Sequence, residues 1–285
     1  MNPYTTLAVL ALSLLPASEA LAQRTLPIAF LGFDGLHEAS NGDVLAAEGF
    51  QGSRIFRIAP SGQTQVVAEG LAGPIDMAED DQGRIYVTTF LDASVYRVDP
   101  DGTVTRFAQV LPFPSGIVRD GQGNLLVAHY GVTDPLTGLG TGDTILRIDP
   151  QGVVSTFASG GLLAAPVGLA LDPLGTLYAG NFHDGQVVAI DALGQQRLLA
   201  DLTGPEISFA IGHLAYAGGR IYATGIQTQS LYRINPRNGR FRARDIGDRA
   251  QFPNGITYRA STGGIVVARG FSPNPDLVQF RVRQY

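Results

Sequence analysis

The chain has 285 residues, with 20 basic against 25 acidic side chains and a formal net charge of -5, which argues against nucleic-acid binding because that needs a basic face. It has no cysteine, which excludes disulfides, thiol catalysis and cysteine-ligated zinc. All basic side chains are Arg, so Schiff-base and lysine general-base chemistry are also excluded.

The first residues have the pattern of an export signal. Residues 7–15 form an apolar run that is too short to span a bilayer, and Ala20, Leu21 and Ala22 offer a small-x-small cleavage site. We expect residues 1–22 to be a signal peptide and residues 23–285 to be the mature protein. The mature protein would be exported to the periplasm or the extracellular space, with no membrane span; a retained membrane anchor is the alternative.

Six copies of one phrase follow along the mature chain. Each copy has a small residue, Gly and an aliphatic residue, then a turn centred on Gly, then an apolar run such as Ile-Tyr-Val. A variable loop, Arg-Ile-Asp-Pro-x-Gly and a final apolar stretch complete it. A period of about 40–50 residues is typical of solenoids, propellers and arrays. The copies begin near Asp34, Gly73, Pro114, Pro166, Ile211 and Asn254.

Each copy predicts four antiparallel strands. Residues 84–88 and 94–98 alternate polar with apolar side chains and are rich in β-branched and aromatic types. The turn that begins at Asp99 has Pro at its second position and Gly102 at its fourth, which is the type I pattern. We call these strands the first to the fourth strand of a repeat.

Six such units cannot each bury a core alone, so they must stack, and closing them into a ring gives a six-bladed propeller. The last copy supplies only three strands of its own, at residues 253–258, 265–269 and 277–282. We expect residues 26–31 to pair with residues 277–282 and complete it. The predicted fold is therefore all-β, a six-bladed β-propeller of four-stranded antiparallel blades closed by the N-terminal strand.

In a propeller, the start of each first strand and the end of each second strand lie around the same mouth of the central channel. Several copies have polar residues at these two positions, where the repeat otherwise has small or apolar residues. Carboxylates that face one channel repel each other unless a cation lies between them. The two rings are Asp34, Asp76, Ser115, Val167, His213 and Asn254, and Glu48, Thr89, His129, Asn181, Gly225 and Arg269.

We expect a small molecule to bind at this channel mouth. His37 supports this prediction because it occupies a first-strand position that holds Ala78, Val118 or Ala170 in other copies. The alternative for any one of these polar side chains is a structural hydrogen bond. The expected ligand contacts are His37, Asp76, Asn181, His183 and His213.

The repeats resemble those of the SMP-30/gluconolactonase-like and NHL-like six-bladed propellers. The matching motifs are Pro-x-Gly-Leu-Ala-x-Asp-x-x-Gly-x-Leu-Tyr-Ala at residues 166–179 and Arg-Ile-Asp-Pro-x-Gly at residues 147–152. The resemblance implies a divalent cation held by Asp34 and Asn254, with Ca²⁺ expected because the ligands are oxygen atoms. No organic cofactor is expected. The family's opening Glu-Gly-Pro-x-Trp is absent, and the chain has no Trp.

The enzyme hypothesis is a metal-dependent hydrolase of lactones or small esters. In this hypothesis His129 or Glu48 acts as general base, and Arg269 stabilises developing negative charge. One alternative is a non-catalytic NHL-like platform for a protein, peptide or carbohydrate, which the long loop at residues 131–143 would serve. Another is a virginiamycin B lyase-like enzyme, although those propellers have seven blades. We expect a monomer.

Overall fold

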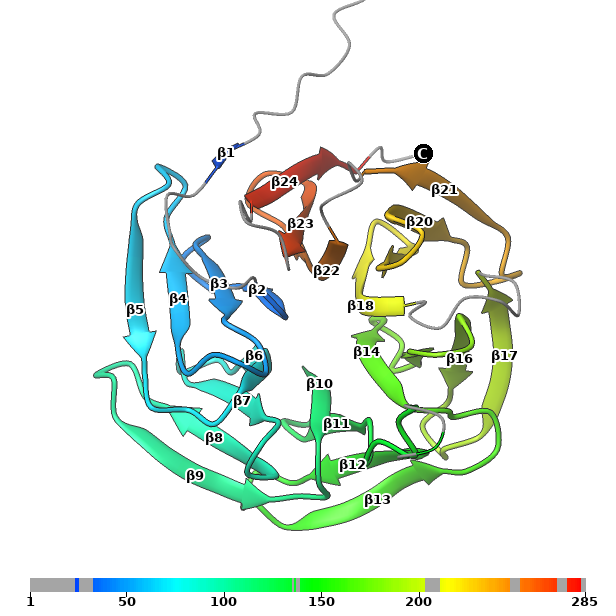
Figure 1. Cartoon of the computed structure of the whole chain (residues 1–285), viewed down its shortest axis with the longest axis horizontal. Helices are drawn as coiled ribbons and strands as arrows, with labels where there is room; N and C mark the ends of the chain where they lie inside the picture. Colours follow the sequence, from blue (N-terminus) through cyan, green and yellow to red (C-terminus); the bar gives the residue numbers. More distant parts are fainter. Residues whose placement is uncertain are drawn as a thin grey trace, which may run out of the picture.

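The computed structural model describes residues 24–25, 33–134, 136, 139–202, 211–246, 252–270 and 276–282. The chain forms an all-β six-bladed propeller, in which six four-stranded antiparallel sheets surround a central channel (Figure 1). The predicted fold class is confirmed. No described segment forms a helix long and apolar enough to cross a membrane.

The first three blades follow the predicted order, with the first strand innermost. Blade one contains β2 (Leu36–Glu38), β3 (Val44–Ala47), β4 (Ile55–Ile58) and β5 (Thr64–Ala68). Blade two contains β6 (Pro74–Glu79), β7 (Ile85–Thr89), β8 (Ser94–Val98) and β9 (Val104–Gln109). Blade three contains β10 (Pro114–Arg119), β11 (Leu125–His129), β12 (Thr144–Ile148) and β13 (Val154–Ser159).

The remaining blades repeat this plan. Blade four contains β14 (Pro166–Leu171), β15 (Leu177–Asn181), β16 (Gln186–Ile190) and β17 (Gln196–Asp201). Blade five contains β18 (Ile211–Ala217), β19 (Arg220–Gly225), β20 (Ser230–Ile234) and β21 (Phe241–Asp245). Blade six contains β22 (Phe252–Arg259), β23 (Gly264–Gly270), β24 (Asp276–Arg281) and β1 (Arg24–Thr25).

The N-terminal strand closes the ring, as predicted. β1 pairs antiparallel with β24, so that Arg24 lies opposite Leu277 and Thr25 lies opposite Asp276 (Figure 1). The pairing residues, 24 and 25, precede the predicted segment, and that segment, residues 26–31, lies outside the described part of the chain. The two ends of the sequence therefore share one sheet, which ties blade six to the start of blade one.

The turns form for the reasons that the sequence indicated. In blade two, the Asp80 carboxylate accepts the backbone N–H groups of Gln82 at 2.9 Å and Arg84 at 3.0 Å. Gly83 in the same turn has a φ of 73°, which glycine adopts without the strain that a Cβ would cause. An Asp and a Gly at fixed positions thus set the hairpin between the first two strands.

The core lies between neighbouring blades. Leu45 and Ile55 of blade one pack against Met77, Ile85 and Val87 of blade two. Every residue of the inner strand β7 is buried, whereas most of the outer strand β9 is not. Burial of apolar faces between blades therefore stabilises the ring, and the inner strands hold their side chains in fixed positions around the channel.

One position near the start of each first strand brings neighbouring blades into close contact. A Cβ on Gly255 would lie 1.8 Å from the Asp34 carbonyl oxygen, and one on Gly168 would lie 2.6 Å from that of Gly212. Glycine is needed there because the backbones approach so closely. Four blades have Gly at this position, and the other two have Asp76 and His213.

Candidate functional site

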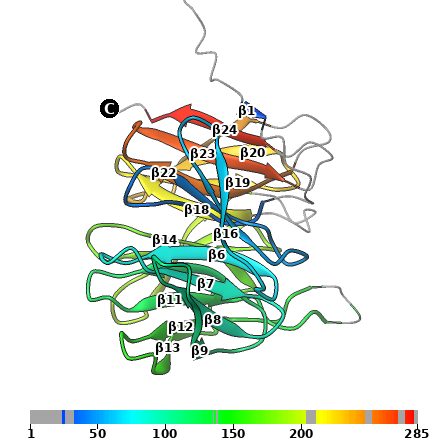
Figure 2. The same cartoon turned by 90° about the vertical axis from the view of Figure 1, so that its left-hand side faces the viewer.

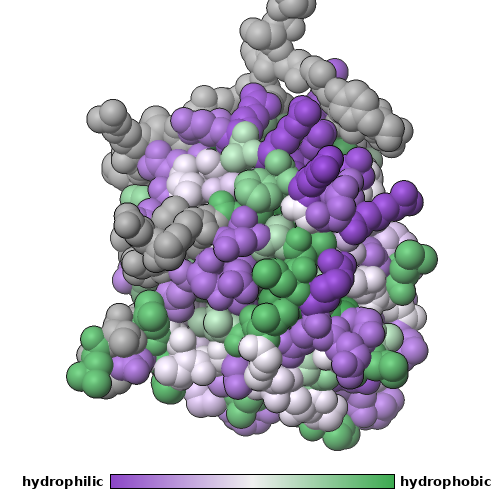
Figure 3. All heavy atoms as spheres, turned by 90° about the vertical axis from the view of Figure 1, so that its right-hand side faces the viewer, coloured by the Kyte–Doolittle hydropathy of each residue, from purple (hydrophilic) through white to green (hydrophobic). Residues whose placement is uncertain are grey.

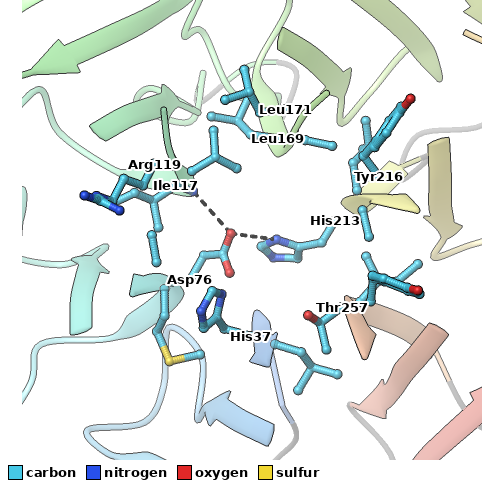
Figure 4. A pocket seen from close by; sticks show the side chains of 18 of the residues that line it. His37, Asp76, Ile117, Arg119, Leu169, Leu171, His213, Tyr216 and Thr257 are labelled. Carbon is cyan, nitrogen blue, oxygen red and sulfur yellow. Dashed lines mark hydrogen bonds and ion pairs between the residues drawn. The ribbon is translucent and has the colours of Figure 1, made fainter. Parts of the chain in front are cut away.

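The side chains of Asp76 and His213 meet in the central channel (Figure 4). His213 Nδ1 lies 3.4 Å from Asp76 Oδ2, and His213 Nε2 lies 2.9 Å from Asp34 Oδ1. Asn254 Nδ2 donates to the same Asp34 oxygen at 2.9 Å, and the Ile117 backbone N–H donates to Asp76 Oδ2 at 3.2 Å. Five of the six blades thus contribute one group each to a network that spans the channel.

The network carries its own cation. Burial alone would lower the pKa of His213, but Asp76 and Asp34 outweigh this effect and raise it to about 10. His213 is therefore an imidazolium at neutral pH, placed between two buried carboxylates. We predicted from the sequence that a cation lies between the channel carboxylates, because they would otherwise repel each other. The protonated side chain of His213 is that cation.

The predicted metal ligands Asp34 and Asn254 do lie together, but the donor set does not fit Ca²⁺. Asp34 Oδ1 already accepts N–H groups from Asn254 and His213. Asn254 Oδ1 is buried and has no hydrogen-bond partner among the described residues, so it remains available to an ion, but it is one oxygen where Ca²⁺ takes six to eight. Within the described ranges, no three or more His, Cys, Asp or Glu side chains are arranged to hold a metal.

A cavity of about 390 Å³ begins at this network and follows the first strands toward their C-terminal ends. Its floor is formed by Asp76 and His213 (Figure 4). We predicted a ligand site at the mouth where first strands begin, whereas this cavity lies on the other side of the network. Its walls include His37, Val118, Ala170, Ala215 and Thr257, and its outer part includes Glu79, Arg119, Leu171, Tyr216 and Tyr258.

Two polar groups point into the cavity. Asp76 Oδ1 is turned toward His37 and accepts no hydrogen bond from the residues that the structure describes (Figure 4). Burial lowers the pKa of His37, and the nearby carboxylates of Glu79 and Asp76 offset only part of this effect. The His37 imidazole is therefore neutral at pH 7, with Nε2 3.8 Å from Glu79 Oε2. Few convergent polar groups between apolar walls are typical of small-molecule sites.

The predicted catalytic residues Glu48 and Arg269 each form an ion pair within their own blade. Glu48 accepts the backbone N–H of Ser53 at 2.9 Å and pairs with the Arg54 guanidinium. Arg269 Nε and Nη2 donate to the Asp276 carboxylate, with Nε 2.7 Å from Oδ1, and Nη1 donates to the Ile246 carbonyl at 3.2 Å. Neither residue lines the cavity. The bonds of Glu48 and Arg269 instead hold a loop and a strand in place.

Asn181, His183 and His129 also lie away from the cavity. Asn181 donates to the Leu162 carbonyl at 2.8 Å and accepts the Ala164 N–H at 3.1 Å. His183 Nε2 accepts the Gly140 N–H at 2.8 Å, which holds the long loop of blade three. His129 is half-buried, and burial lowers its pKa. These side chains belong to the mouth where second strands end.

Sequence reasoning missed a row of aromatic rings at that mouth. Ring centroids are 6.4 Å apart for Phe50 and Phe90, 4.7 Å for Phe90 and Phe113, and 6.0 Å for Phe90 and Tyr130. Phe182 continues the row, 5.6 Å from Tyr130. The signal was an aromatic residue just after the second strand in four consecutive copies.

The long loop of blade three lies beside this row and extends from the same face (Figure 2). Thr133 and Gly140 form an antiparallel bridge within it, and the Gly142 N–H donates to the Tyr130 carbonyl at 2.8 Å. The long loop noted at residues 131–143 in the sequence thus extends from the mouth where second strands end.

A family model described as a repeat of unknown function (DUF6923) matches residues 128–284, which is more than half of the chain. No curated protein matches the chain.

Solved propellers match most of the chain at low identity. A gluconolactonase from Xanthomonas campestris is 17% identical, with a TM-score of 0.73 over 89% of this chain and 88% of that one. A virginiamycin B lyase from Staphylococcus aureus with quinupristin is 16% identical, with a TM-score of 0.67 over 92% and 99%. The propeller of a nidogen/laminin complex is 18% identical, with a TM-score of 0.67 over 79% and 84%. The resemblance to gluconolactonase-like propellers is thus confirmed at the level of the fold.

Proposed function

The chain belongs to the DUF6923 family, a repeat of unknown function, and we propose that its central cavity binds a small, uncharged, hydroxyl-rich molecule. The observation that carries the proposal is the pair of polar groups in the cavity, Asp76 Oδ1 and the neutral His37 imidazole. The carboxylate accepts hydroxyl donors, and a neutral imidazole both donates and accepts. A volume of about 390 Å³ lies within the usual range for small-ligand pockets.

The charges around the cavity favour such a ligand over an anion. Asp76 and Glu79 are carboxylates, and Arg119 already pairs with Asp81, with Nη2 3.0 Å from Oδ2. The charge of His213 is balanced by Asp34 and Asp76. An anionic ligand would therefore meet net repulsion.

The reaction that this arrangement supports best is hydrolysis of a lactone or small ester without a metal step. His37 is positioned to take a proton from water as the water oxygen bonds to the carbonyl carbon. The ester C–O bond then breaks, and His37 returns the proton to the leaving oxygen, which gives a hydroxy acid. Glu79, 3.8 Å from His37, stabilises the imidazolium that forms in between. The product carboxylate is repelled by Asp76, which favours its release.

The test is hydrolysis of a panel of neutral sugar lactones and small esters, beginning with glucono-1,5-lactone. His37→Gln should lower kcat by roughly 10²- to 10⁴-fold, as expected for loss of a general base. Asp76→Asn should mainly raise KM. The matched control is His129→Gln, which alters a half-buried histidine outside the cavity. Equal losses in the His37 and His129 variants would reject the role of the cavity.

The row of aromatic rings favours a second candidate, a binding platform at the opposite mouth. In that case Phe90→Ala should abolish capture of peptides from a random displayed library and leave lactone hydrolysis unchanged. Retained capture by the variant would remove this candidate.

Export belongs to the same proposal and rests on the apolar run and the cleavage site near Ala22. N-terminal sequencing of the protein from a secreting host should begin at Gln23. A chain that retains residues 1–22 would contradict export by signal cleavage.

A further inference from the structure

The first strands present a second ring of channel-facing positions, two residues after the ring that holds Asp76 and His213. Side chains two residues apart on a strand lie on the same face of the sheet. The neighbouring blades one and six have His37 and Thr257 in this second ring. The other four blades have small or apolar side chains there, which are Ala78, Val118, Ala170 and Ala215. The polar groups of this ring are therefore confined to one side of the cavity.

The Thr257 hydroxyl has a fixed oxygen and an unused hydrogen. Its Oγ1 accepts the Glu38 backbone N–H at 3.2 Å, a bond that joins β22 to β2. The hydroxyl donates to none of the residues that the structure describes, and Thr257 is only 8% exposed. Its oxygen is turned toward the inside of the cavity (Figure 4). A buried hydroxyl that only accepts can still donate a hydrogen bond to a bound molecule.

The other donors among the described lining residues are engaged or lie farther out. Both ring nitrogens of His213 lie against carboxylates of the channel network. The Arg119 guanidinium donates to the Asp81 carboxylate at 3.1 and 3.0 Å. The two tyrosines that line the cavity belong to its outer part. Thr257 is therefore the donor that lies next to His37 in the inner cavity.

Thr257 and His37 are held together by one contact. Glu38 directly follows His37 in β2, and its N–H is the group that binds the Thr257 oxygen. Both carboxylates that line the cavity belong to blade two, which does not adjoin blade six. The protonated His213 lies on blade five, which does adjoin it. Negative charge that develops at Thr257 is thus placed away from the carboxylates and toward the imidazolium.

A substrate reaches Thr257 along the channel. Figure 3 shows the side of the ring that carries β17 and β21 as a continuous surface, with hydrophilic side chains gathered over its upper part. The cavity itself follows the first strands toward their C-terminal ends. A substrate carbonyl can therefore lie between blades one and six, while the rest of the molecule extends along the apolar walls of the other blades.

We propose that the Thr257 hydroxyl binds the carbonyl oxygen of the substrate and stabilises the oxyanion that forms there. The proposal rests on the hydrolysis proposed above for the same cavity. As the water oxygen bonds to the carbonyl carbon and His37 takes a proton from the water, the π electron pair of the C=O bond moves to the carbonyl oxygen. Thr257 donates a hydrogen bond to this oxygen and keeps its proton. The electron pair returns as the ester C–O bond breaks, and the leaving oxygen takes the proton from His37.

The test compares the mature wild type with Thr257→Val and Thr257→Ser on the panel member that the wild type hydrolyses fastest. Valine has the shape of threonine without the hydroxyl, so kcat should fall by about 10²- to 10³-fold, the usual effect of losing one oxyanion donor. KM should change much less. Thr257→Ser keeps the hydroxyl and should retain most of the activity. The matched control is Thr144→Val, which removes a buried hydroxyl outside the cavity.

Binding of two uncharged analogues separates a direct contact from a structural role. Glucono-1,5-lactam has the carbonyl oxygen, whereas 1,5-anhydroglucitol has the ring hydroxyls and no carbonyl. Thr257→Val should bind the lactam about 2- to 10-fold more weakly, as expected for one hydrogen bond, and should bind 1,5-anhydroglucitol as tightly as the wild type does. The Tm is measured alongside, because Thr257→Val also removes the acceptor of the Glu38 N–H.

The possible results have different consequences. If Thr257→Val keeps the wild-type kcat, the role of Thr257 is wrong while hydrolysis in the cavity stands. Equal weakening for the lactam and for 1,5-anhydroglucitol would assign Thr257 to the structure alone and would also overturn the proposal. A wild type that hydrolyses no member of the panel would reject the hydrolysis itself, and this proposal with it.

Discussion

Replacing His213 with Gln should strongly destabilise the propeller. The change removes the imidazolium but leaves Asp34 and Asp76, each less than a tenth exposed, without a cation between them. Breaking a buried ion pair by removing one partner costs about 3–5 kcal/mol. For a chain of this size, about 2–4 °C is lost per kcal/mol, so the Tm at pH 7 should fall by roughly 6–20 °C.

The pH dependence of stability gives a sharper form of the same prediction. The pKa of His213 rises from 6.5 in the unfolded chain to about 10 in the folded protein. Between these pH values only the folded state holds the proton. The contribution of the charged His213 to the free energy of unfolding is therefore complete below pH 6.5 and is lost as the pH rises through 10. The free energy of unfolding of the wild type should therefore fall by about 1.4 kcal/mol per pH unit relative to His213→Gln.

The assay is urea unfolding followed by far-ultraviolet circular dichroism at pH values between 6 and 10, because the chain has no Trp to report by fluorescence. His129→Gln is the control, since this half-buried histidine has no comparable carboxylate pair. Its unfolding free energy should follow that of the wild type at every pH. If the wild type and His213→Gln lose stability in parallel, the imidazolium assignment is refuted.

Further substitutions test other parts of the structure. Arg269→Met should cost about 3–5 kcal/mol, because the buried Asp276 carboxylate loses its guanidinium partner, while kcat of the folded fraction stays unchanged. Gly168→Ala should cost about 1–3 kcal/mol, seen as a lower Tm, because its Cβ would lie 2.6 Å from the Gly212 oxygen. Deleting residues 24–31 should lower the Tm in one cooperative transition, and an unchanged Tm would argue against ring closure by β1. A bound metal would stabilise the folded state, so its removal would lower the Tm. We expect no metal at Asp34 and Asn254, and dialysis against EDTA should therefore leave the Tm within about 1 °C.

The fold was predictable because its signals are local and repeated. The Asp80 turn depends on residues within one hairpin, and the same turn recurs at Asp120 of blade three and Asp172 of blade four. The closing strand was predicted from the missing fourth strand of blade six, and its pairing with Leu277 confirms that argument. The pairing residues themselves were not predicted, since the closing strand was expected at residues 26–31 and residues 24 and 25 carry no strong strand pattern.

The site was only partly predictable. Asp76 and His213 could be found because they replace a Gly that close backbone contact requires in the other four blades. The partners of Glu48 and Arg269 could not be found, because they depend on how Arg54 and Asp276 fold back within each blade. Nor did the copies reveal on which side of the network the cavity lies, since that depends on side-chain packing.

The most direct test of the account is the protonation state of the histidine rings, measured by nitrogen-15 NMR of the mature protein at pH 8. The four histidines can be assigned from single His→Gln variants. We predict that both ring nitrogens of His213 carry protons, while His37 is neutral and able to act as a base. A neutral or metal-bound His213, or a charged His37, would contradict the account.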